Sequence, residues 1–255
     1  MVELGLIGYP LGHSYSPAYF EAKFRAAGVS GKYSLFPIKS IDRLPELLQH
    51  HPGLAGLNVT VPYKQQVKKY LDNIDPSAEE IGAVNTIKIT GQPGGEKTLT
   101  GFNTDWIGFS KSLQPLLENK KIGTALVLGT GGAAHAVAYA LRRLGISPTF
   151  VSRRPSESEL TPAIGYDDVT AQIIADNLLI VNTTPLGMSP NIDTCPPVPY
   201  QFVTPRHIFY DLIYNPEETE FLKKGAAAGA VTKNGLDMLH LQADAAWEIW
   251  TSVKD

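Results

Sequence analysis

Two groups of residues in this 255-residue chain have the types and the spacing to do chemistry. The first group is spread over the first 105 residues and combines hydroxyl, amide, amine and carboxylate side chains. Its earliest members are Ser14 and Ser16, two hydroxyls that stand just before a helix-like segment. Either serine could also cap that helix, so this pair alone does not separate binding from capping.

The remaining members of the first group follow strand-like segments. Asn58 and Thr60 are two residues apart on a strand-like run, so their side chains share one face, and Lys64 follows just past its end. Asn85 lies in another such run, and Asp105 stands between the two halves of the sequence. Taken singly, each could be a turn residue, a satisfied core polar group or a surface lysine. Together they suit a small polyhydroxy acid.

The second group is a glycine-rich turn, GTGGAA, over Gly129–Ala134. It fits the pattern G-x-G-x-x-A, in which Gly129 permits a tight turn, Gly131 lets the backbone approach a pyrophosphate, and Ala134 lets the helix pack close to the sheet. The turn follows an apolar run and opens an Ala-rich helix, which is the context that a dinucleotide site requires. We predict dinucleotide binding, with a plain tight turn as the alternative.

The end of the next strand-like run selects the cofactor. About 20 residues after the glycines, an acid would bind a ribose 2′-hydroxyl. The chain instead has Ser152, Arg153 and Arg154, and no acid before Glu157. A planar guanidinium suits a 2′-phosphate, so the sequence favours NADP over NAD. The alternative is a solvated basic turn.

Strand-like and helix-like segments alternate along the chain, which predicts an α/β fold with a mainly parallel sheet and helices on both faces. We expect one domain over 1–105, completed by a C-terminal helix over 236–255, and a second over 106–235. A Gly/Pro-rich turn is expected over 92–97 and a polar loop over 156–160. The expected strands are 4–7, 33–38, 54–61, 83–89, 124–128, 149–152, 178–183 and 208–212, and the expected helices include 17–27, 41–49, 65–72 and one that runs from the glycines to 144.

Composition excludes several classes of protein. The 22 Lys and Arg against 25 Asp and Glu give a net charge of −3, which argues against nucleic acid or an anionic membrane as the main partner. Hydrophobic residues at 43% exclude disorder for the bulk of the chain. The single cysteine, Cys195, excludes an intramolecular disulfide and fits a reducing compartment. With no signal-like N-terminus and no apolar run near membrane length, we expect a cytoplasmic protein. No Cys/His cluster suggests a metal site.

Eight short motifs follow one another along the whole chain. They are GYPLGHSYSP over 8–17, NVTVPYK over 58–64, GAVNT over 82–86, GFNTD over 101–105, GTGG over 129–132, NTTPLGM over 182–188, DLIYNP over 211–216 and NGLDM over 234–238. Any one of them is weak, whereas eight in the same order are specific. With these motifs the sequence resembles the shikimate dehydrogenases.

The resemblance implies an N-terminal α/β substrate domain, a Rossmann-like NADP-binding domain and a cleft between them. It implies an enzyme that reversibly reduces 3-dehydroshikimate to shikimate with NADPH, in aromatic amino-acid biosynthesis. We expect a monomer or a homodimer. The family's catalytic pair falls on Lys64 and Asp105. The substrate-binding groups fall on Ser14, Ser16, Asn58, Thr60, Lys64, Asn85, Asp105, Tyr214 and Gln242, and the cofactor groups fall on Gly129, Gly131, Gly132, Ala133, Ser152, Arg153, Arg154, Thr183, Met188, Leu212 and Gly235.

The chain departs from the family pattern at two places. Many members have a His-Asn pair where this chain has Phe20 and Glu21, and Asn-Arg-Thr where this chain has Ser152-Arg153-Arg154. Two other functions stay open. One is a quinate/shikimate dehydrogenase of broader specificity, and the other is a ligand sensor on the same fold without turnover, which loss of Lys64 or Asp105 would indicate.

Overall fold

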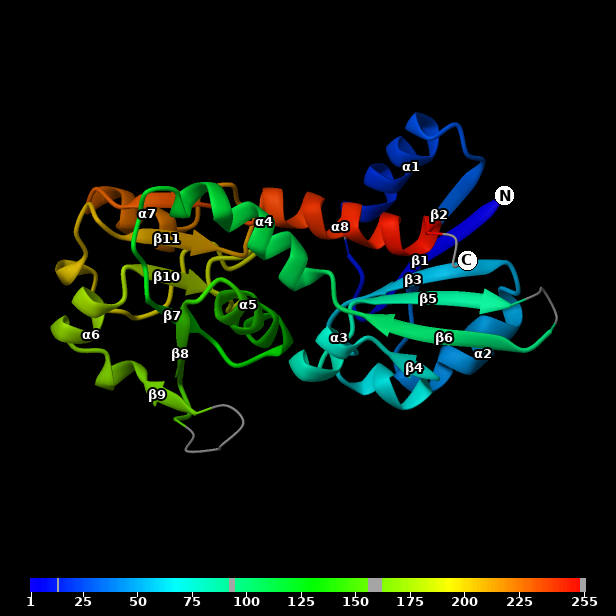
Figure 1. The fold of residues 1–255 in the computed structure, drawn as a ribbon, viewed down its shortest axis with the longest axis horizontal. Helices are drawn as coiled ribbons and strands as arrows, with labels where there is room; N and C mark the ends of the chain where they lie inside the picture. The colour runs from blue at the N-terminus through cyan, green and yellow to red at the C-terminus, as the bar shows by residue number, and fades with distance from the viewer. Residues whose placement is uncertain (13, 92–94, 156–161, 253–255) are drawn as a thin grey trace. The chain divides into compact units, whose positions relative to one another are not determined.

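The structure is a computed structural model that describes residues 1–12, 14–91, 95–155 and 162–252 (Figure 1). The chain divides into two compact units, one formed by Met1–Thr104 with Ala243–Asp255 and the other by Asp105–Gln242. The last helix, α8 (Leu236–Thr251), therefore contributes residues to both units. The loop expected over 156–160 and residues 92–94 of the turn expected over 92–97 lie outside the described residues.

The first unit is built on a mixed sheet with the strand order β2-β1-β3-β5-β6-β4. Strand β1 pairs in parallel with β2 and β3, and β4 pairs in parallel with β6, whereas β5 runs antiparallel to β3 and β6. The strands are β1 (Val2–Gly8), β2 (Gly31–Pro37), β3 (Leu54–Val59), β4 (Asn73–Ile74), β5 (Thr86–Gly91) and β6 (Lys97–Phe102).

Helices cover both faces of this sheet, and each face has its own apolar core. On one face, Phe20 and Phe24 of α1 (Ser16–Ala26) pack with Tyr33 and with Trp247 and Trp250 of α8. On the other face the core is closed by η1 (Ile41–Arg43), α2 (Leu44–His50), η2 (Gln66–Tyr70) and α3 (Pro76–Ile81). Side chains at alternate strand positions therefore lie on opposite faces.

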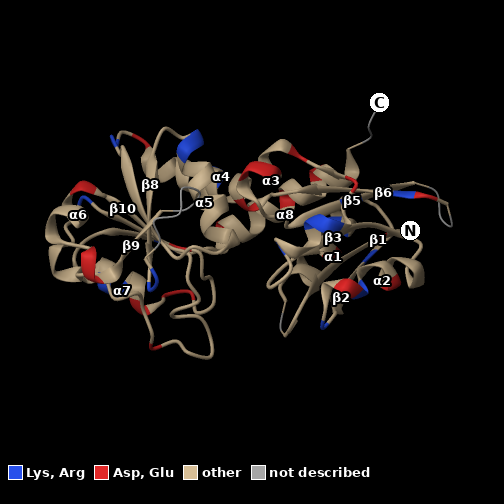
Figure 2. Ribbon diagram, turned by 90° about the horizontal axis from the view of Figure 1, so that it is seen from below, with Lys and Arg blue, Asp and Glu red and all other residues tan. Residues whose placement is uncertain are grey.

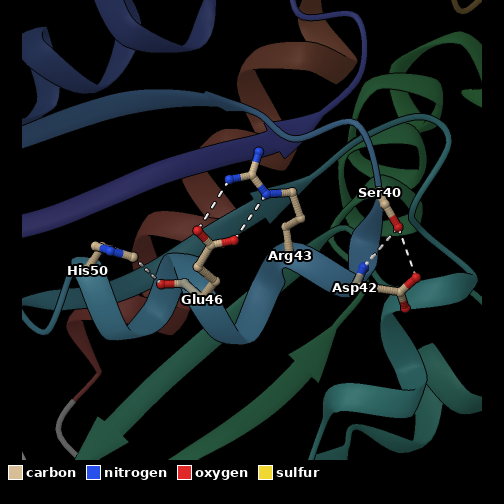
Figure 3. Close-up of polar contacts among 5 residues, drawn as sticks. All are labelled: Ser40, Asp42, Arg43, Glu46 and His50. Atoms are coloured by element: carbon tan, nitrogen blue, oxygen red, sulfur yellow. Dashed lines mark hydrogen bonds and ion pairs between the residues drawn. The ribbon is translucent and has the colours of Figure 1, made fainter.

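Local polar contacts hold the segment at α2 (Figure 3). The Ser40 hydroxyl oxygen accepts from the Asp42 backbone N–H at 3.2 Å, and Arg43 pairs with Glu46 at 3.1 Å. His50 contacts the Glu46 carbonyl oxygen through Nδ1 at 2.8 Å and is exposed at the helix end.

Across the described residues, no group of three or more His, Cys, Asp or Glu side chains could hold a metal ion.

The second unit is a parallel sheet with the strand order β12-β11-β10-β7-β8-β9. Numbered within this unit, the order is 6-5-4-1-2-3, which is the doubly wound arrangement of dinucleotide-binding domains. Apolar cores lie on both faces of the sheet. The elements are α4 (Asp105–Leu117), β7 (Thr124–Leu128), α5 (Gly132–Arg143), β8 (Ser147–Ser152), β9 (Ala163–Gly165), η3 (Tyr166–Asp168), α6 (Ala171–Asp176), β10 (Leu179–Asn182), η4 (Tyr200–Phe202), β11 (Ile208–Asp211), α7 (Glu220–Ala227) and β12 (Val231–Lys233).

The prediction of an α/β chain with helices on both sheet faces is confirmed, but the helix expected over 65–72 is wrong. Over that range the chain forms only the short 3-10 helix η2, and strand β4, whose residues pair with β6, begins directly after the range. Hydrogen bonds between Asp72 and Leu99 draw the chain to the sheet, since the Asp72 N–H donates to the Leu99 carbonyl at 3.0 Å and the Asp72 carboxylate accepts from the Leu99 N–H at 2.7 Å.

Charged residues of both signs are interspersed along both units (Figure 2). Within the described residues, no helix has the length and apolar character needed to cross a membrane.

Candidate active site

The predicted cofactor groups lie at one edge of the second unit's sheet. Gly129 follows β7, Ser152 ends β8, Thr183 follows β10 and Leu212 follows β11. Because these strands are parallel, their carboxyl ends meet at the same edge. In doubly wound sheets, ligands bind at this edge, beside the point where the strand order reverses. Here that point is between β7 and β10, where the Thr183 hydroxyl donates to the Leu128 carbonyl oxygen at 2.6 Å.

The glycine-rich turn has the geometry that the sequence predicts for an anion site. Gly129 has a φ of +111°, and a Cβ there would lie 2.8 Å from the Thr183 hydroxyl oxygen. Gly131 is the N-cap of α5, no side chain caps the helix, and the first turn holds no acidic residue. The N–H groups of Gly132 and Ala133 begin the helix, where they favour negative charge. The turn therefore fits the pyrophosphate of a dinucleotide.

A polar pocket of about 560 Å³ lies beside this turn, lined by Thr130, Ser152, Arg153 and Arg154. The Ser152 hydroxyl oxygen accepts from the Arg154 backbone N–H at 3.2 Å, which tightens the turn after β8. Both arginine side chains are exposed. Two guanidiniums just after β8, the second strand of this unit, fit a phosphate on the adenosine ribose.

Leu212 and Gly235 come together through their backbones. A Cβ on Gly235 would lie 2.0 Å from the Leu212 carbonyl oxygen, so only glycine fits there. The Gly235 N–H also donates to the Ile213 carbonyl at 3.0 Å. Met188 is 48% exposed in the loop after β10, and Tyr214 is half-buried.

The loop that carries Leu212 and Tyr214 is held by a buried carboxylate, Asp211. It accepts hydrogen bonds from the Thr219 hydroxyl at 2.7 Å, the Ile213 N–H at 3.0 Å and the Asn182 amide at 3.0 Å. Burial raises the pKa of Asp211 to about 6, although these hydrogen bonds oppose the shift. Asp211 thus ties the ends of β10 and β11 to the start of α7.

The raised pKa of Asp211 makes stability depend on pH. A folded-state pKa above the usual 3.8 means that the folded protein binds this proton more tightly than the unfolded chain does. The resulting contribution to the free energy of unfolding is complete below about pH 4 and is lost as pH rises through about 6. At about 1.4 kcal/mol for each pKa unit, it amounts to on the order of 3 kcal/mol. We expect Asp211→Asn to remove it, since the amide cannot ionise.

Urea unfolding at several pH values between 4 and 7 tests this prediction. The fall in stability over that range should be smaller in Asp211→Asn than in the wild type. The matched control is Asp176→Asn, which changes an exposed carboxylate of the same unit and should keep the wild-type pH dependence. Parallel pH profiles for Asp211→Asn and the wild type would contradict the assignment.

In the first unit, the predicted substrate groups Asn58 and Asn85 belong to one buried hydrogen-bond network. The Asn58 amide Nδ2 donates to the Thr86 hydroxyl oxygen at 3.2 Å, and the Thr86 hydroxyl donates to Asn85 Oδ1 at 3.1 Å. Asn85 Oδ1 also accepts from the Thr104 backbone N–H at 2.7 Å. The network therefore fixes both amides and the backbone at the end of the first unit, directly before Asp105.

Thr60 and Lys64 lie in the turn just past β3. The Thr60 N–H donates to the Ile7 carbonyl at 2.9 Å, and the Tyr63 N–H donates to the Thr60 carbonyl at 2.9 Å. The Lys64 carbonyl accepts from the Val84 N–H at 2.7 Å, which joins this turn to the segment that carries Asn85. The Lys64 side chain is half-buried.

The serine pair lies at the start of α1. The Ser14 hydroxyl oxygen accepts from the Ser16 backbone N–H at 3.3 Å, so Ser14 satisfies one of the free amides of the first turn. The N-cap residue itself is Tyr15, and its side chain makes no capping hydrogen bond. The Ser16 side chain does not cap the helix.

Asp105, Tyr214 and Gln242 belong to the second unit. Asp105 is buried and is the first residue of α4, where a carboxylate is favoured by the helix dipole. The Gln242 amide donates to the Leu239 carbonyl at 2.9 Å in its own helix. Helices α4 and α8 approach closely here, because a Cβ on Gly108 would lie 2.9 Å from Gln242 Cβ.

Sequence reasoning missed several residues that position these groups. Thr130 lines the basic pocket, and Thr86 and Thr104 complete the network of the first unit. Asn182 and Asp211 are each the first residue of a motif that carries the resemblance, and both are fully buried. The sequence signal that could have indicated their pairing was an amide and a carboxylate, each at the end of an apolar strand-like run.

Comparison with known proteins identifies the family. The family model described as the shikimate dehydrogenase substrate binding domain matches residues 6–87. The shikimate dehydrogenase (NADP(+)) of Desulforamulus reducens is 39% identical in an alignment 264 residues long. The alignment covers 97% of this chain and 89% of the relative. The chain belongs to the shikimate dehydrogenase family.

Solved structures of shikimate dehydrogenases and of a quinate dehydrogenase also match nearly the whole chain. The shikimate dehydrogenase of Thermus thermophilus, solved with NADP(H) and shikimate, is 32% identical with a TM-score of 0.85, covering 99% of this chain and 94% of that one. The quinate dehydrogenase of Corynebacterium glutamicum, solved with NAD, is 30% identical with a TM-score of 0.86, also covering 99% and 94%.

Proposed function

We propose that this protein catalyses the reversible NADP-dependent reduction of 3-dehydroshikimate to shikimate, in aromatic amino-acid biosynthesis. The observation that carries the proposal is the 39% identity, over 97% of the chain, to a relative named as an NADP(+)-dependent shikimate dehydrogenase. The basic pocket after β8 supports the choice of cofactor.

The second unit offers a site for each part of NADP. The N–H groups of Gly129, Gly131, Gly132 and Ala133 would bind the pyrophosphate. Ser152, Arg153 and Arg154 would bind the 2′-phosphate, and Thr183, Met188, Leu212 and Gly235 would face the nicotinamide part. When bound, the nicotinamide supplies the hydride that reduces the carbonyl carbon.

The chain's own residues bind the substrate and move the proton. In the direction of reduction, the carbonyl carbon gains a hydride and the carbonyl oxygen gains a proton. We assign the proton transfer to the Lys64 amine, which donates during reduction and accepts during oxidation. Asp105 would orient that amine and accept a hydrogen bond from a substrate hydroxyl. The other substrate groups would be Ser14, Ser16, Asn58, Thr60, Asn85, Tyr214 and Gln242.

A broader specificity is the second candidate. It is favoured by the match to a quinate dehydrogenase solved with NAD. Against the NAD part stand Arg153 and Arg154, because the described residues that line their pocket include no acidic side chain. A sensor without turnover is disfavoured by the presence of both Lys64 and Asp105. We further propose a cytoplasmic enzyme that is a monomer or a homodimer.

Initial rates with four substrate pairs test these alternatives. Shikimate and quinate are each combined with NADP+ and with NAD+, and the reduced nicotinamide is followed by absorbance. We expect fast turnover only with shikimate and NADP+. Comparable rates with quinate or NAD+ would assign the broader specificity, and no turnover with any pair would favour a sensor.

A further inference from the structure

Tyr33 is a buried tyrosine to which the proposed reaction gives no role. It lies on β2, whereas Asn58 lies on β3, and β1 separates the two strands. The Tyr33 hydroxyl crosses that strand and donates to Asn58 Oδ1 at 2.7 Å. Tyr33 is 5% exposed and Asn58 is 7% exposed, so this is a hydrogen bond of the interior. A buried acceptor that loses its donor is costly, which gives the hydroxyl a specific task.

The partners of Asn58 permit only one orientation of its amide. On the side opposite Tyr33, Asn58 Nδ2 donates to the Asn85 carbonyl oxygen at 3.3 Å and to the Thr86 hydroxyl oxygen at 3.2 Å. A flipped amide would place its oxygen against the Asn85 carbonyl oxygen. Both Nδ2 hydrogens are therefore used, and a ligand can be bound only through the second lone pair of Oδ1.

The Tyr33 ring is held so that its hydroxyl cannot swing away. The ring stacks on Phe20, with centroids 4.6 Å apart and planes 11° from parallel. Phe20 is 1% exposed and in turn packs against Trp250 at 5.3 Å. Phe20 is one of the residues at which the chain departs from the family pattern, and its place in the fold is this aromatic stack.

The same hydroxyl also interacts with Ser16, a second residue assigned to the substrate. A hydrogen bond with the Ser16 side chain opposes the rise that burial causes in the pKa of Tyr33. Because the net direction is upward, the phenol stays protonated at working pH and remains a donor. Tyr33 thus lies between Ser16 and Asn58, two of the groups assigned to the substrate.

We propose that Tyr33 is a positioning residue for substrate binding, and that it holds Asn58 as a hydrogen-bond acceptor for a substrate hydroxyl. The inference rests on the proposed function, because Asn58 is a substrate group only in that reaction. Tyr33 acts through Asn58 and does not move a proton, so its loss weakens binding of shikimate and leaves the rate of the chemical step almost unchanged.

The Tyr33→Phe variant tests the proposal, because it keeps the ring and removes only the hydroxyl. We expect KM for shikimate to rise about 5- to 20-fold, the equivalent of one hydrogen bond, with kcat and KM for NADP+ within about twofold of the wild type. The matched control is Tyr210→Phe, which removes a buried hydroxyl bonded to Ser112 in the second unit. Tyr210→Phe should leave KM for shikimate unchanged.

A double-mutant cycle separates positioning from a general loss of stability. In an Asn58→Ala background, Tyr33→Phe should raise KM for shikimate by less than about twofold, since the main effect passes through Asn58 and only the contact with Ser16 remains. Provided that the wild type turns over shikimate, two results would overturn the inference. One is an unchanged KM for shikimate in Tyr33→Phe, and the other is the same rise in that KM when Tyr33→Phe is added to Asn58→Ala. Absence of shikimate turnover in the wild type would instead overturn the proposed function.

Discussion

We expect the Lys64→Ala variant to lower kcat for shikimate oxidation by about 10²- to 10⁴-fold, the range that general acid–base catalysis contributes. KM for shikimate should change less than about fivefold, because hydroxyl and amide groups supply most of the binding. The structure anchors the backbone of Lys64, because the Lys64 carbonyl accepts a hydrogen bond from the Val84 N–H. The side chain that carries the amine is half-buried.

Steady-state kinetics on Lys64→Ala and a matched lysine variant check this expectation. The control is Lys69→Ala. Lys69 lies a few residues after Lys64 in the chain, is exposed and forms an ion pair with Asp42. The Lys69→Ala enzyme should retain at least about half of the wild-type kcat, because exposed ion pairs contribute little. A Lys64→Ala enzyme with near-normal kcat would exclude Lys64 from proton transfer.

The second large effect concerns the cofactor. Replacing both Arg153 and Arg154 with alanine should raise KM for NADP+ by about 10²- to 10³-fold, since each charge-assisted hydrogen bond to phosphate contributes about 1.5–3 kcal/mol. KM for NAD+ should change less than about threefold, because NAD+ has no 2′-phosphate. The variant should therefore lose its preference for NADP+.

The control for this effect is a second pair of arginines in the same unit. Arg142 and Arg143 are exposed in the last turn of α5, and their replacement changes the net charge by the same amount. That double variant should keep the wild-type preference for NADP+. Equal weakening of NADP+ and NAD+ in the Arg153/Arg154 variant would show that the pair does not read the 2′-phosphate.

The nucleotide-binding half was the more predictable part of the fold. An apolar run over 124–128, a glycine turn and an Ala-rich helix lie next to one another in sequence, and the structure has β7, the Gly129 turn and α5 there. The basic pair after the next strand also follows from local sequence, because strand ends in a parallel sheet meet at one edge. Each of these inferences needs only neighbouring residues.

The first unit was less predictable, because distant pairings decide its details. Strand β4 exists because Asn73 pairs with Thr100 of β6, and local helical spacing over 65–72 gives no sign of that partner. Likewise, the Tyr33–Asn58 hydrogen bond joins residues 25 positions apart across an intervening strand. Sequence spacing identified Asn58 as a polar strand residue but could not identify the group that orients it.

Transfer of an isotope from substrate to cofactor tests the proposed reaction most directly. Shikimate carrying deuterium on the carbon of its 3-hydroxyl is incubated with NADP+ and the wild-type protein, and both products are examined by mass spectrometry. We predict one deuterium in the reduced nicotinamide for each 3-dehydroshikimate formed. Reduced cofactor without deuterium, or no 3-dehydroshikimate, would contradict the assignment of this protein as an NADP-dependent shikimate dehydrogenase.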